Sequence, residues 1–459
     1  MSDGTPLKKI LKTSLPAVID LSSQTIMWTI EAILIGKLSA AAFAGVGMGN
    51  QIIVVIFTVL ITFIVGASLI ITRYLGAGEN YQANHILGQA LMIGVILSVS
   101  IGVFLFLSAP SLFTIIRESD STGLTHGTTS KEAASAGVTY IKTVALFVPL
   151  IITNFIAIGI IRGAGDTHLS MLVNIVINGL NLFLAPNLIF GWLWFPRLEV
   201  QGAALAVGIS HSVGFIITLY VLRTRKSVLF LSLRELTTPN FTSFKRLFKM
   251  GFPATIEQMV WAIGMLVVTG YAAFSGITVL ATHQVFVRIQ AILSMAYLGI
   301  GMSSMTLIGK NIGAEEHRLA EKTGQLAYRI AFVLSIIVVV VMIGFSKSLI
   351  SVFTTDNEVL RFGSISIIMF ALTQIPKAVN GVIIGNLRGA ADLKWLMWST
   401  IIGVAFLEIG LNWGIIIYIK DKLYIVFALW AVQGFDETLR LCFNFFRFKG
   451  GKWKLIDNL

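Results

Sequence analysis

Long apolar segments recur along the whole chain and decide what it can fold into. Most of them exceed twenty residues and lack the strict alternation of a half-buried strand. Of the 459 residues, 56% are hydrophobic and only 12% are charged, whereas a soluble domain carries about 25% charged residues. Only helices and closed barrels satisfy their backbone groups inside a bilayer, and these segments have the length of spanning helices. The sequence therefore predicts an all-α polytopic membrane protein.

Twelve membrane-spanning helices are expected, six in each half of the chain. The predicted spans are 13–36, 43–72, 83–110, 133–162, 167–192, 200–223, 250–275, 278–311, 321–346, 358–388, 393–418 and 422–446. We expect an N-terminal lobe of residues 1–223, a cytoplasmic linker of residues 224–249 and a C-terminal lobe of residues 250–459. Within the linker, the basic segment SFKRLFKM is expected to lie on the membrane surface as an amphipathic lead-in to the seventh span.

The distribution of basic residues predicts the orientation. If the N-terminus is cytoplasmic, the even-numbered connections are cytoplasmic too, and that side receives most of the lysines and arginines, including the clusters KKILK and RTRK. We expect the protein in the inner membrane of the cell. The positive-inside rule then places both termini in the cytoplasm. The net charge of +12 follows from this topology, so a nucleic-acid partner is not expected.

The two halves of the chain repeat one another. TPLKKILKTSLPAVID (5–20) aligns without gaps with TSFKRLFKMGFPATIE (242–257), which pairs Asp20 with Glu257. Two shorter motifs match in the same order: LGAGEN (75–80) with IGAEEH (312–317), and IRGAGDT (161–167) with LRGAADL (387–393). Because each half has an even number of spans, the second half re-enters with the same orientation. Two six-helix lobes related by a pseudo-two-fold along the membrane normal are the expected result.

An acidic residue lies deep in the first predicted span. In LPAVIDLSSQTIMWTIEAILIGK (15–37), Asp20, Gln24 and Glu31 fall at i, i+4 and i+11 and share one helix face. An ionisable group at the depth of Glu31 costs roughly 3 kcal/mol or more unless it faces protein or water, and such groups usually mark ion or substrate paths. The alternative is a carboxylate paired with a basic residue of another helix for packing alone. We favour a functional role for Glu31.

Uncharged hydrogen-bonding residues are concentrated in the same half. The predicted fifth span reads NIVINGLN, which places Asn174, Asn178 and Asn181 on one face. The second and fourth spans add further candidates for the cavity: Asn50, Gln51, Tyr140, Thr143, Thr153 and Asn154. Such groups around one deep acid stabilise either its protonated form or a bound cation. Hydrogen bonding between helices, worth about 0.6 kcal/mol a bond, is the alternative for each asparagine taken singly.

Motifs of known enzymes are missing from the sequence. It contains no P-loop, HExxH, paired-cysteine zinc motif, GxSxG or kinase signature, so neither an enzyme nor a cofactor or metal site is expected. The single Cys442 excludes an internal disulfide. His211 and His283 are lone histidines within spans, more typical of packing than of metal ligation, and His283 is kept as a cavity candidate. Gly45 and Gly49 in GVGMGN predict a close helix contact.

Nearly the whole chain resembles the MATE family, the multidrug and toxic compound extrusion antiporters. The resemblance is carried by the order of several motifs: SLPAVIDLSSQTIMWTIEAILIGKL, AAAFAGVGMGNQI, TRYLGAGE, IIRGAGD, INGLNLFLAPNLIF, VQGAALAVGIS, ATHQ and LRGAAD. It implies twelve helices in two lobes and a substrate bound between the lobes near the membrane midplane.

The resemblance also implies which residues carry the coupling cation. Archaeal and bacterial members have an aspartate fifteen residues after the first-span proline, and Glu31 lies fifteen residues after Pro16. The tyrosine and asparagine partners of that acid fall on Tyr140 and Asn181. Three carboxylates are kept as second-rank candidates: Asp20, Glu257 and Glu408.

At three other positions the chain departs from the family pattern. A fifth-span aspartate is Ala185, a sixth-span threonine is Val207, and the second-lobe carboxylate of sodium-coupled members falls on Lys377. A second-lobe cation site like theirs is therefore not expected. Because Ala185 and Val207 have no side-chain oxygen, sodium would lack two of its ligands at this site. H⁺ is therefore favoured over Na⁺ as the coupling ion.

From these features we expect a cation-coupled antiporter that exports amphipathic, cationic organic compounds by alternating access. It is expected to act as a monomer, with the bilayer and small-molecule substrates as its partners. A flippase for a lipid-linked precursor is the alternative. A flippase would need a basic cavity for the phosphate head group. Few basic residues lie inside the first lobe, and Lys142 is the main one.

Overall fold

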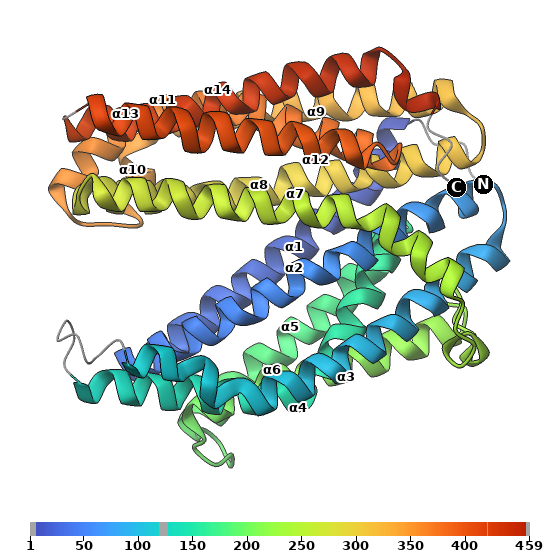
Figure 1. The fold of residues 1–459 in the computed structure, drawn as a ribbon, viewed down its shortest axis with the longest axis horizontal. Coiled ribbons are helices and arrows are strands. Elements are labelled where there is room, and N and C mark those ends of the chain that lie inside the picture. The colour runs from blue at the N-terminus through green and yellow to red at the C-terminus, as the bar shows by residue number, and fades with distance from the viewer. Residues whose placement is uncertain (1–5, 119–126, 420, 456–459) are drawn as a thin grey trace. The chain divides into compact units, whose positions relative to one another are not determined.

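The computed structural model describes residues 6–118, 127–419 and 421–455, and most of them are helical (Figure 1). The helices of the first half are α1 (Pro6–Gly36), α2 (Ala40–Gly76), α3 (Asn80–Glu118), α4 (Gly127–Gly163), α5 (Thr167–Phe190) and α6 (Glu199–Arg223). The short 3₁₀ helix η2 (Leu233–Leu236) leads to the second half. Its helices are α7 (Phe241–Phe274), α8 (Ile277–Gly313), α9 (His317–Gly344), α10 (Ser346–Ser351), α11 (Asn357–Gly389), α12 (Leu393–Ile402), the π-helical segment η3 (Gly403–Leu411), α13 (Asn412–Tyr418), α14 (Lys422–Lys449) and η4 (Lys452–Leu455).

Eleven helical segments of the described residues are long and apolar enough to cross a membrane, counting the run α12–η3–α13 as one. The remaining long helix, α14, has 28 residues, but it carries Asp436, Glu437 and Arg440 in its middle, so its apolar run is interrupted. The predicted all-α polytopic fold with twelve long helices is confirmed.

The largest difference from the predicted span ends is at α7. The segment SFKRLFKM, which was predicted to precede the seventh span, forms the first turns of α7, which begins at Phe241. Phe244 and Phe248 lie against Phe63 of α2, with ring centroids 6.2 and 6.5 Å apart. Part of the aromatic face of this segment therefore packs on α2, while Phe241 and Phe248 stay exposed.

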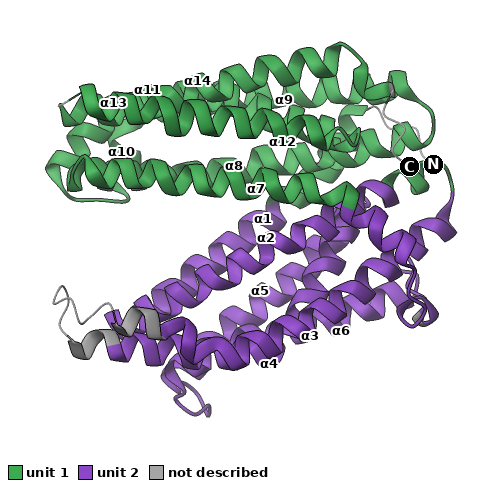
Figure 2. Ribbon diagram, in the orientation of Figure 1, with its two compact units in different colours: residues 1–18, 72–78, 249–459 green, residues 19–71, 79–248 purple. Residues whose placement is uncertain are grey.

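The chain forms two compact units, which Figure 2 colours separately. Unit 1 contains residues 1–18, 72–78 and 249–459, and unit 2 contains residues 19–71 and 79–248. The division differs from the halves of the chain, because the beginning of α1 and the end of α2 pack with the second half.

Two glycines of the internal repeat explain why the end of α2 belongs to unit 1. A Cβ atom on Gly76 would overlap the backbone of Lys310, and one on Gly313 would overlap the backbone of Arg73. Each glycine thus contacts the residue three positions before the other, so α2 and α8 approach closely at their ends. The Arg73 guanidinium adds a hydrogen bond of 2.9 Å to the backbone oxygen of Ala390.

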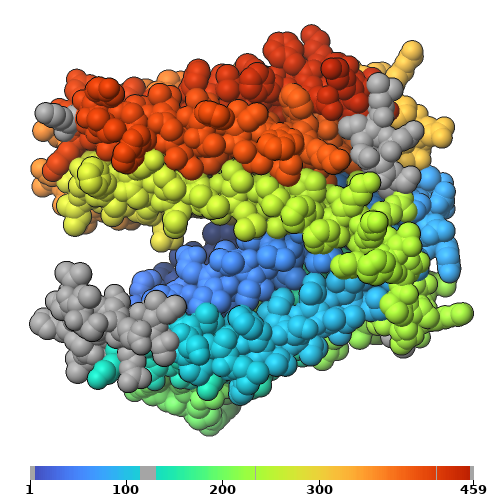
Figure 3. All heavy atoms as spheres, viewed as in Figure 1, coloured from blue at the N-terminus to red at the C-terminus, as the bar shows by residue number. Residues whose placement is uncertain are grey.

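In unit 1, α11 packs against α8, α9 and α14. The rings of Phe286 and Phe370 stack with centroids 4.7 Å apart, and Trp430 meets both edge-on. The space-filling view shows the side chains of α7 (yellow-green) against those of the α12–α13 run (orange) (Figure 3). There the Tyr271 hydroxyl donates to the backbone oxygen of Ile409 at 3.2 Å.

In unit 2, α4 packs against α3, α5 and α6. The close helix contact predicted from Gly45 is confirmed, because a Cβ atom there would overlap the backbone oxygen of Ala133 in α4. Gly49 lies one turn along α2, where a Cβ atom would be 3.3 Å from Ile141. This contact holds the first turns of α2 close to α4, where the candidate site lies.

Candidate functional site

Glu31 lies in α1 of unit 2 with only 6% of its surface exposed. The Tyr140 hydroxyl of α4 is 3.5 Å from Glu31 Oε1 and 3.2 Å from Asn50 Oδ1 of α2. One hydroxyl proton serves one acceptor at a time, so Tyr140 donates either to the carboxylate or to the amide. The structure thus brings together three of the residues that the sequence singled out.

Glu31 differs from the other buried carboxylates of the described residues. Six others are buried, and each forms an ion pair with a lysine or arginine: Asp20, Glu257, Asp392, Glu408, Asp436 and Glu437. Among the residues that the structure describes, Glu31 forms no ion pair; its hydrogen-bond donor is the Tyr140 hydroxyl. Glu31 is therefore the one buried carboxylate of the described residues that has no lysine or arginine partner.

Asp20 is held by three donors on other helices. Its carboxylate is fully buried, lies 2.8 Å from the Arg162 guanidinium, and accepts hydrogen bonds from Asn174 (2.6 Å) and Ser170 (3.2 Å). In unit 1, Glu257 lies 2.8 Å from the Arg388 guanidinium. Two of the second-rank carboxylates are therefore already neutralised by arginines.

The asparagine face of α5 lies along α1. Asn174 donates to Asp20, and Asn178 Nδ2 donates to Ser23 Oγ at 3.0 Å. Continuing the same register by helical turns places Asn181 about one turn before Glu31 and Ala185 at its level. Asn181 is 2% exposed, and its Nδ2 has no hydrogen-bond partner within the described part of the chain. Its predicted role beside Glu31 stays a prediction.

The remaining predicted cavity residues of unit 2 lie in different surroundings. Asn154 is buried, and its Oδ1 accepts a hydrogen bond of 2.8 Å from Thr218, which links α4 to α6. Gln51 is exposed on α2. No hydrogen bond of the described residues therefore links Asn154 to Glu31. Hydrogen bonding between α4 and α6 explains why Asn154 is buried.

Unit 1 contains a buried cluster of charges around α14. Lys377 of α11 lies 3.1 Å from Glu437. Arg440 pairs with Asp436, lies 3.4 Å from Glu437, and approaches Glu408 of η3 at 3.7 Å. The cluster thus holds three carboxylates against two cations, and Glu408 is engaged within it.

The sequence reasoning missed the α14 members of this cluster. Asp436, Glu437 and Arg440 stand in DETLR within the twelfth predicted span. Acids three and four residues before an arginine share a helix face, and charges inside a span usually face protein, so this spacing was the available signal. Lys377 has Glu437 as its partner.

A small cavity of about 40 Å³ adjoins the cluster, lined among others by His283, Glu408, Asn412 and Trp430. His283 Nδ1, Asn412 Oδ1 and Trp430 Nε1 have no hydrogen-bond partner within the described residues. The volume suits a few water molecules but not an organic substrate. His283 belongs to unit 1, whereas Glu31 belongs to unit 2.

Comparison with known proteins relates the whole chain to one group. The MatE family model matches residues 16–187 and 253–414. The "Probable multidrug resistance protein NorM" of Thermotoga maritima is 26% identical over 449 residues, which cover 97% of this chain and 93% of that protein.

Solved structures show the same fold. A MOP superfamily transporter from Pyrococcus furiosus, described as having a binding pocket of reverse polarity that suggests a different function, matches with a TM-score of 0.85 at 23% identity, over 98% of this chain and 97% of that one. A crystal structure of MATE in complex with MaL6 matches with a TM-score of 0.87 at 22% identity, over 98% of each chain. The twelve-helix arrangement of these proteins is thus the fold of this chain.

Proposed function

The chain belongs to the MatE family, whose model matches most of its length, and we propose that it is a cation-coupled antiporter that exports amphipathic, cationic organic compounds. It is a multi-pass membrane transporter, related to proteins named for multidrug resistance. These names favour efflux of small molecules over the flippase alternative. We also propose that it exchanges substrate for a cation, acts as a monomer and keeps both termini in the cytoplasm.

One observation carries the coupling role of Glu31: it is the buried carboxylate of the described residues that has no basic partner. An ionised carboxylate in this position costs several kcal/mol unless a cation or a proton accompanies it. At Asp20 and Glu257 an arginine supplies that charge permanently. At Glu31 no fixed residue of the described chain supplies the positive charge, so a mobile ion supplies it. An exchange site requires this arrangement.

Tyr140 and Asn50 give this site two hydrogen-bonding arrangements. While Glu31 carries a negative charge, the Tyr140 hydroxyl donates to it; once an ion neutralises Glu31, the hydroxyl donates to Asn50 Oδ1 instead. A hydrogen bond to a charged acceptor is worth about 1.5–3 kcal/mol, against about 1 kcal/mol to a neutral one. Ion loading at Glu31 therefore changes how α1 is tied to α4 and α2, and this is the step that links ion to conformation.

The proton is the proposed coupling ion. Sodium is a hard cation that wants several oxygen ligands in a closed shell, by analogy with calcium and magnesium. Around Glu31 the hydrogen-bonded groups supply the Tyr140 hydroxyl and the Asn50 amide oxygen, while Ala185 and Val207 supply no side-chain oxygen. A proton needs the carboxylate alone.

Efflux of a fluorescent organic cation from proteoliposomes tests the proposal. With equal pH on both sides, an inward sodium gradient should give no efflux above the rate without a gradient, whereas an imposed proton gradient should drive it. A protonophore should abolish the proton-driven rate. Sodium-driven efflux that persists with the protonophore present would replace the proton by sodium. Absence of gradient-driven efflux under every ion condition would overturn coupled export of this substrate class.

A further inference from the structure

A groove lies on the surface of unit 1 between α9 and α14, with a volume of about 390 Å³. Its wall on α9 consists of Tyr328, Arg329 and Phe332, and its wall on α14 includes Leu441, Cys442 and Phe446. We propose that this α9–α14 groove binds an anionic phospholipid, with the lipid phosphate at Arg329 and an acyl chain along the apolar walls below it.

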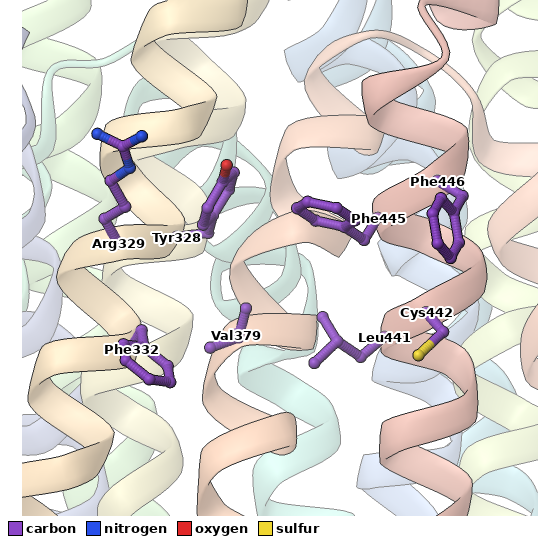
Figure 4. Close-up of a pocket in the computed structure, with 8 residues that line it drawn as sticks. All are labelled: Tyr328, Arg329, Phe332, Val379, Leu441, Cys442, Phe445 and Phe446. Carbon is purple, nitrogen blue, oxygen red and sulfur yellow. The ribbon is translucent and has the colours of Figure 1, made fainter.

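The groove has two tiers of different chemistry (Figure 4). In the upper tier of this view, the Arg329 guanidinium and the Tyr328 hydroxyl point in the same direction, and the ring of Phe445 lies between Tyr328 and Phe446. The lower tier contains Phe332, Leu441 and Cys442. One end thus offers hydrogen-bond donors and a positive charge, and the other offers only apolar surface and a thiol. A phospholipid has the same division between its phosphate and its acyl chain.

The position of Arg329 along α9 matches the boundary between the head groups and the hydrocarbon. The helix opens with the polar stretch HRLAEKTGQ, and Arg329 is its last charged residue; the following fifteen residues, IAFVLSIIVVVVMIG, contain none. An arginine at such a boundary directs its guanidinium towards the head groups while its stem stays among apolar groups. This end of α9 is on the side that the sequence predicts to be cytoplasmic, where anionic lipids attract basic residues.

The charge of Arg329 is free to bind a phosphate. Arg329 is exposed, and it forms no ion pair with any residue that the structure describes. Glu321, two turns before it on α9, is paired instead with Lys454 at 2.7 Å. Lys322, exposed at i−7, lies on the same helix face as Arg329 and adds a second positive charge towards the head groups. The local field therefore favours an anionic lipid over a zwitterionic one.

The exposed apolar side chains of this face favour lipid as its partner. Phe332 is 49% exposed and Phe446 is 68% exposed, and further along α9 Val333, Ile337 and Val340 are each at least 55% exposed. In a membrane-spanning helix such a surface contacts acyl chains. The groove differs from the rest of this surface because a basic residue borders it. The inference does not depend on the transport reaction.

Cys442 makes a direct test possible, because it is the single cysteine of the chain and is exposed in the lower tier. The full-length protein in detergent micelles is titrated with phosphatidylglycerol or with phosphatidylcholine, and the rate of Cys442 alkylation by a maleimide is measured. A lipid seated in the groove covers the thiol. We expect phosphatidylglycerol to slow alkylation several-fold in a saturable manner and phosphatidylcholine to have little effect.

Two variants separate this site from general lipid adsorption. Arg329→Gln should remove the difference between the two lipids, and Arg329→Lys should retain most of it. The matched control is Arg361→Gln, which removes an exposed arginine near the N-terminal end of α11. This change should leave the protection by phosphatidylglycerol unchanged. Equal protection by both lipids in the unmodified protein, or equal responses of R329Q and R361Q, would overturn the proposal. Because Arg329 is exposed, neither substitution is expected to impair folding.

Discussion

Arg162 of α4 and Asp20 of α1 form a buried ion pair at 2.8 Å, and the internal repeat reproduces it in the other unit. Arg388 and Glu257 occupy the equivalent sequence positions and lie 2.8 Å apart. In each half the acid follows a proline by four residues and the arginine belongs to an RGAxD motif. The repeat therefore preserves an interaction between two helices as well as a sequence.

Breaking the first pair is expected to destabilise the protein. Arg162→Gln leaves the Asp20 carboxylate buried without its counter-charge, a change that costs about 3–5 kcal/mol in buried pairs. Thermal unfolding of the purified protein should show a clear loss, and the double variant D20N/R162Q should recover part of it. The control is Arg197→Gln, since the Arg197–Glu199 pair is largely exposed and such pairs contribute at most about 1 kcal/mol. Equal unfolding temperatures for R162Q and R197Q would contradict this interpretation.

Tyr140→Phe tests the switching hydroxyl beside Glu31. The substitution removes the donor that serves Glu31 and Asn50 while keeping the ring. The loss of a hydrogen bond of about 1.5–3 kcal/mol to the charged carboxylate predicts a decrease in efflux of roughly ten- to a hundredfold. Tyr297→Phe is the matched control, because the buried Tyr297 hydroxyl has no hydrogen-bond partner among the described residues. A Y140F protein as active as Y297F would remove Tyr140 from the coupling site.

The orientation in the membrane is tested by cysteine labelling in a Cys442→Ser background. Single cysteines at positions 230 and 455 should react only with reagent supplied from the cytoplasm, and one at position 125 only with reagent from outside. The physical reason is the excess of lysine and arginine on the side that carries the even-numbered connections. Labelling of positions 125 and 230 from the same face would contradict the predicted twelve-span topology.

The helices were largely predictable, because apolar length and charge placement depend on local sequence. Span 167–192, for example, corresponds to α5, Thr167–Phe190. The start of α7 was less predictable. In its first turns Phe244 and Phe248 pack on Phe63, a residue far away in the sequence. A pattern of charges and apolar residues does not distinguish lipid from such a partner.

For the candidate site, the sequence identified Asp20 and Glu31 but not which of them has a basic partner. Asp20 and Glu31 stand on one face of α1 and look alike in the sequence, yet Arg162 neutralises the first and no described basic residue pairs with the second. Such pairs join helices that are far apart in the chain, and no periodicity reveals them. The Glu437–Lys377 pair of unit 1 was missed for the same reason.

Glu31→Gln tests the central claim most directly. Glutamine keeps the size of the side chain and its hydrogen bonding with Tyr140, but it carries no charge that an ion could exchange. Efflux of an organic cation from proteoliposomes under an imposed proton gradient is measured for E31Q, for the unmodified protein and for Glu199→Gln, which changes an exposed glutamate of α6. The account predicts that E31Q loses gradient-driven efflux while still expressing and folding, and that E199Q transports normally. Gradient-driven efflux by E31Q at the unmodified rate would contradict it.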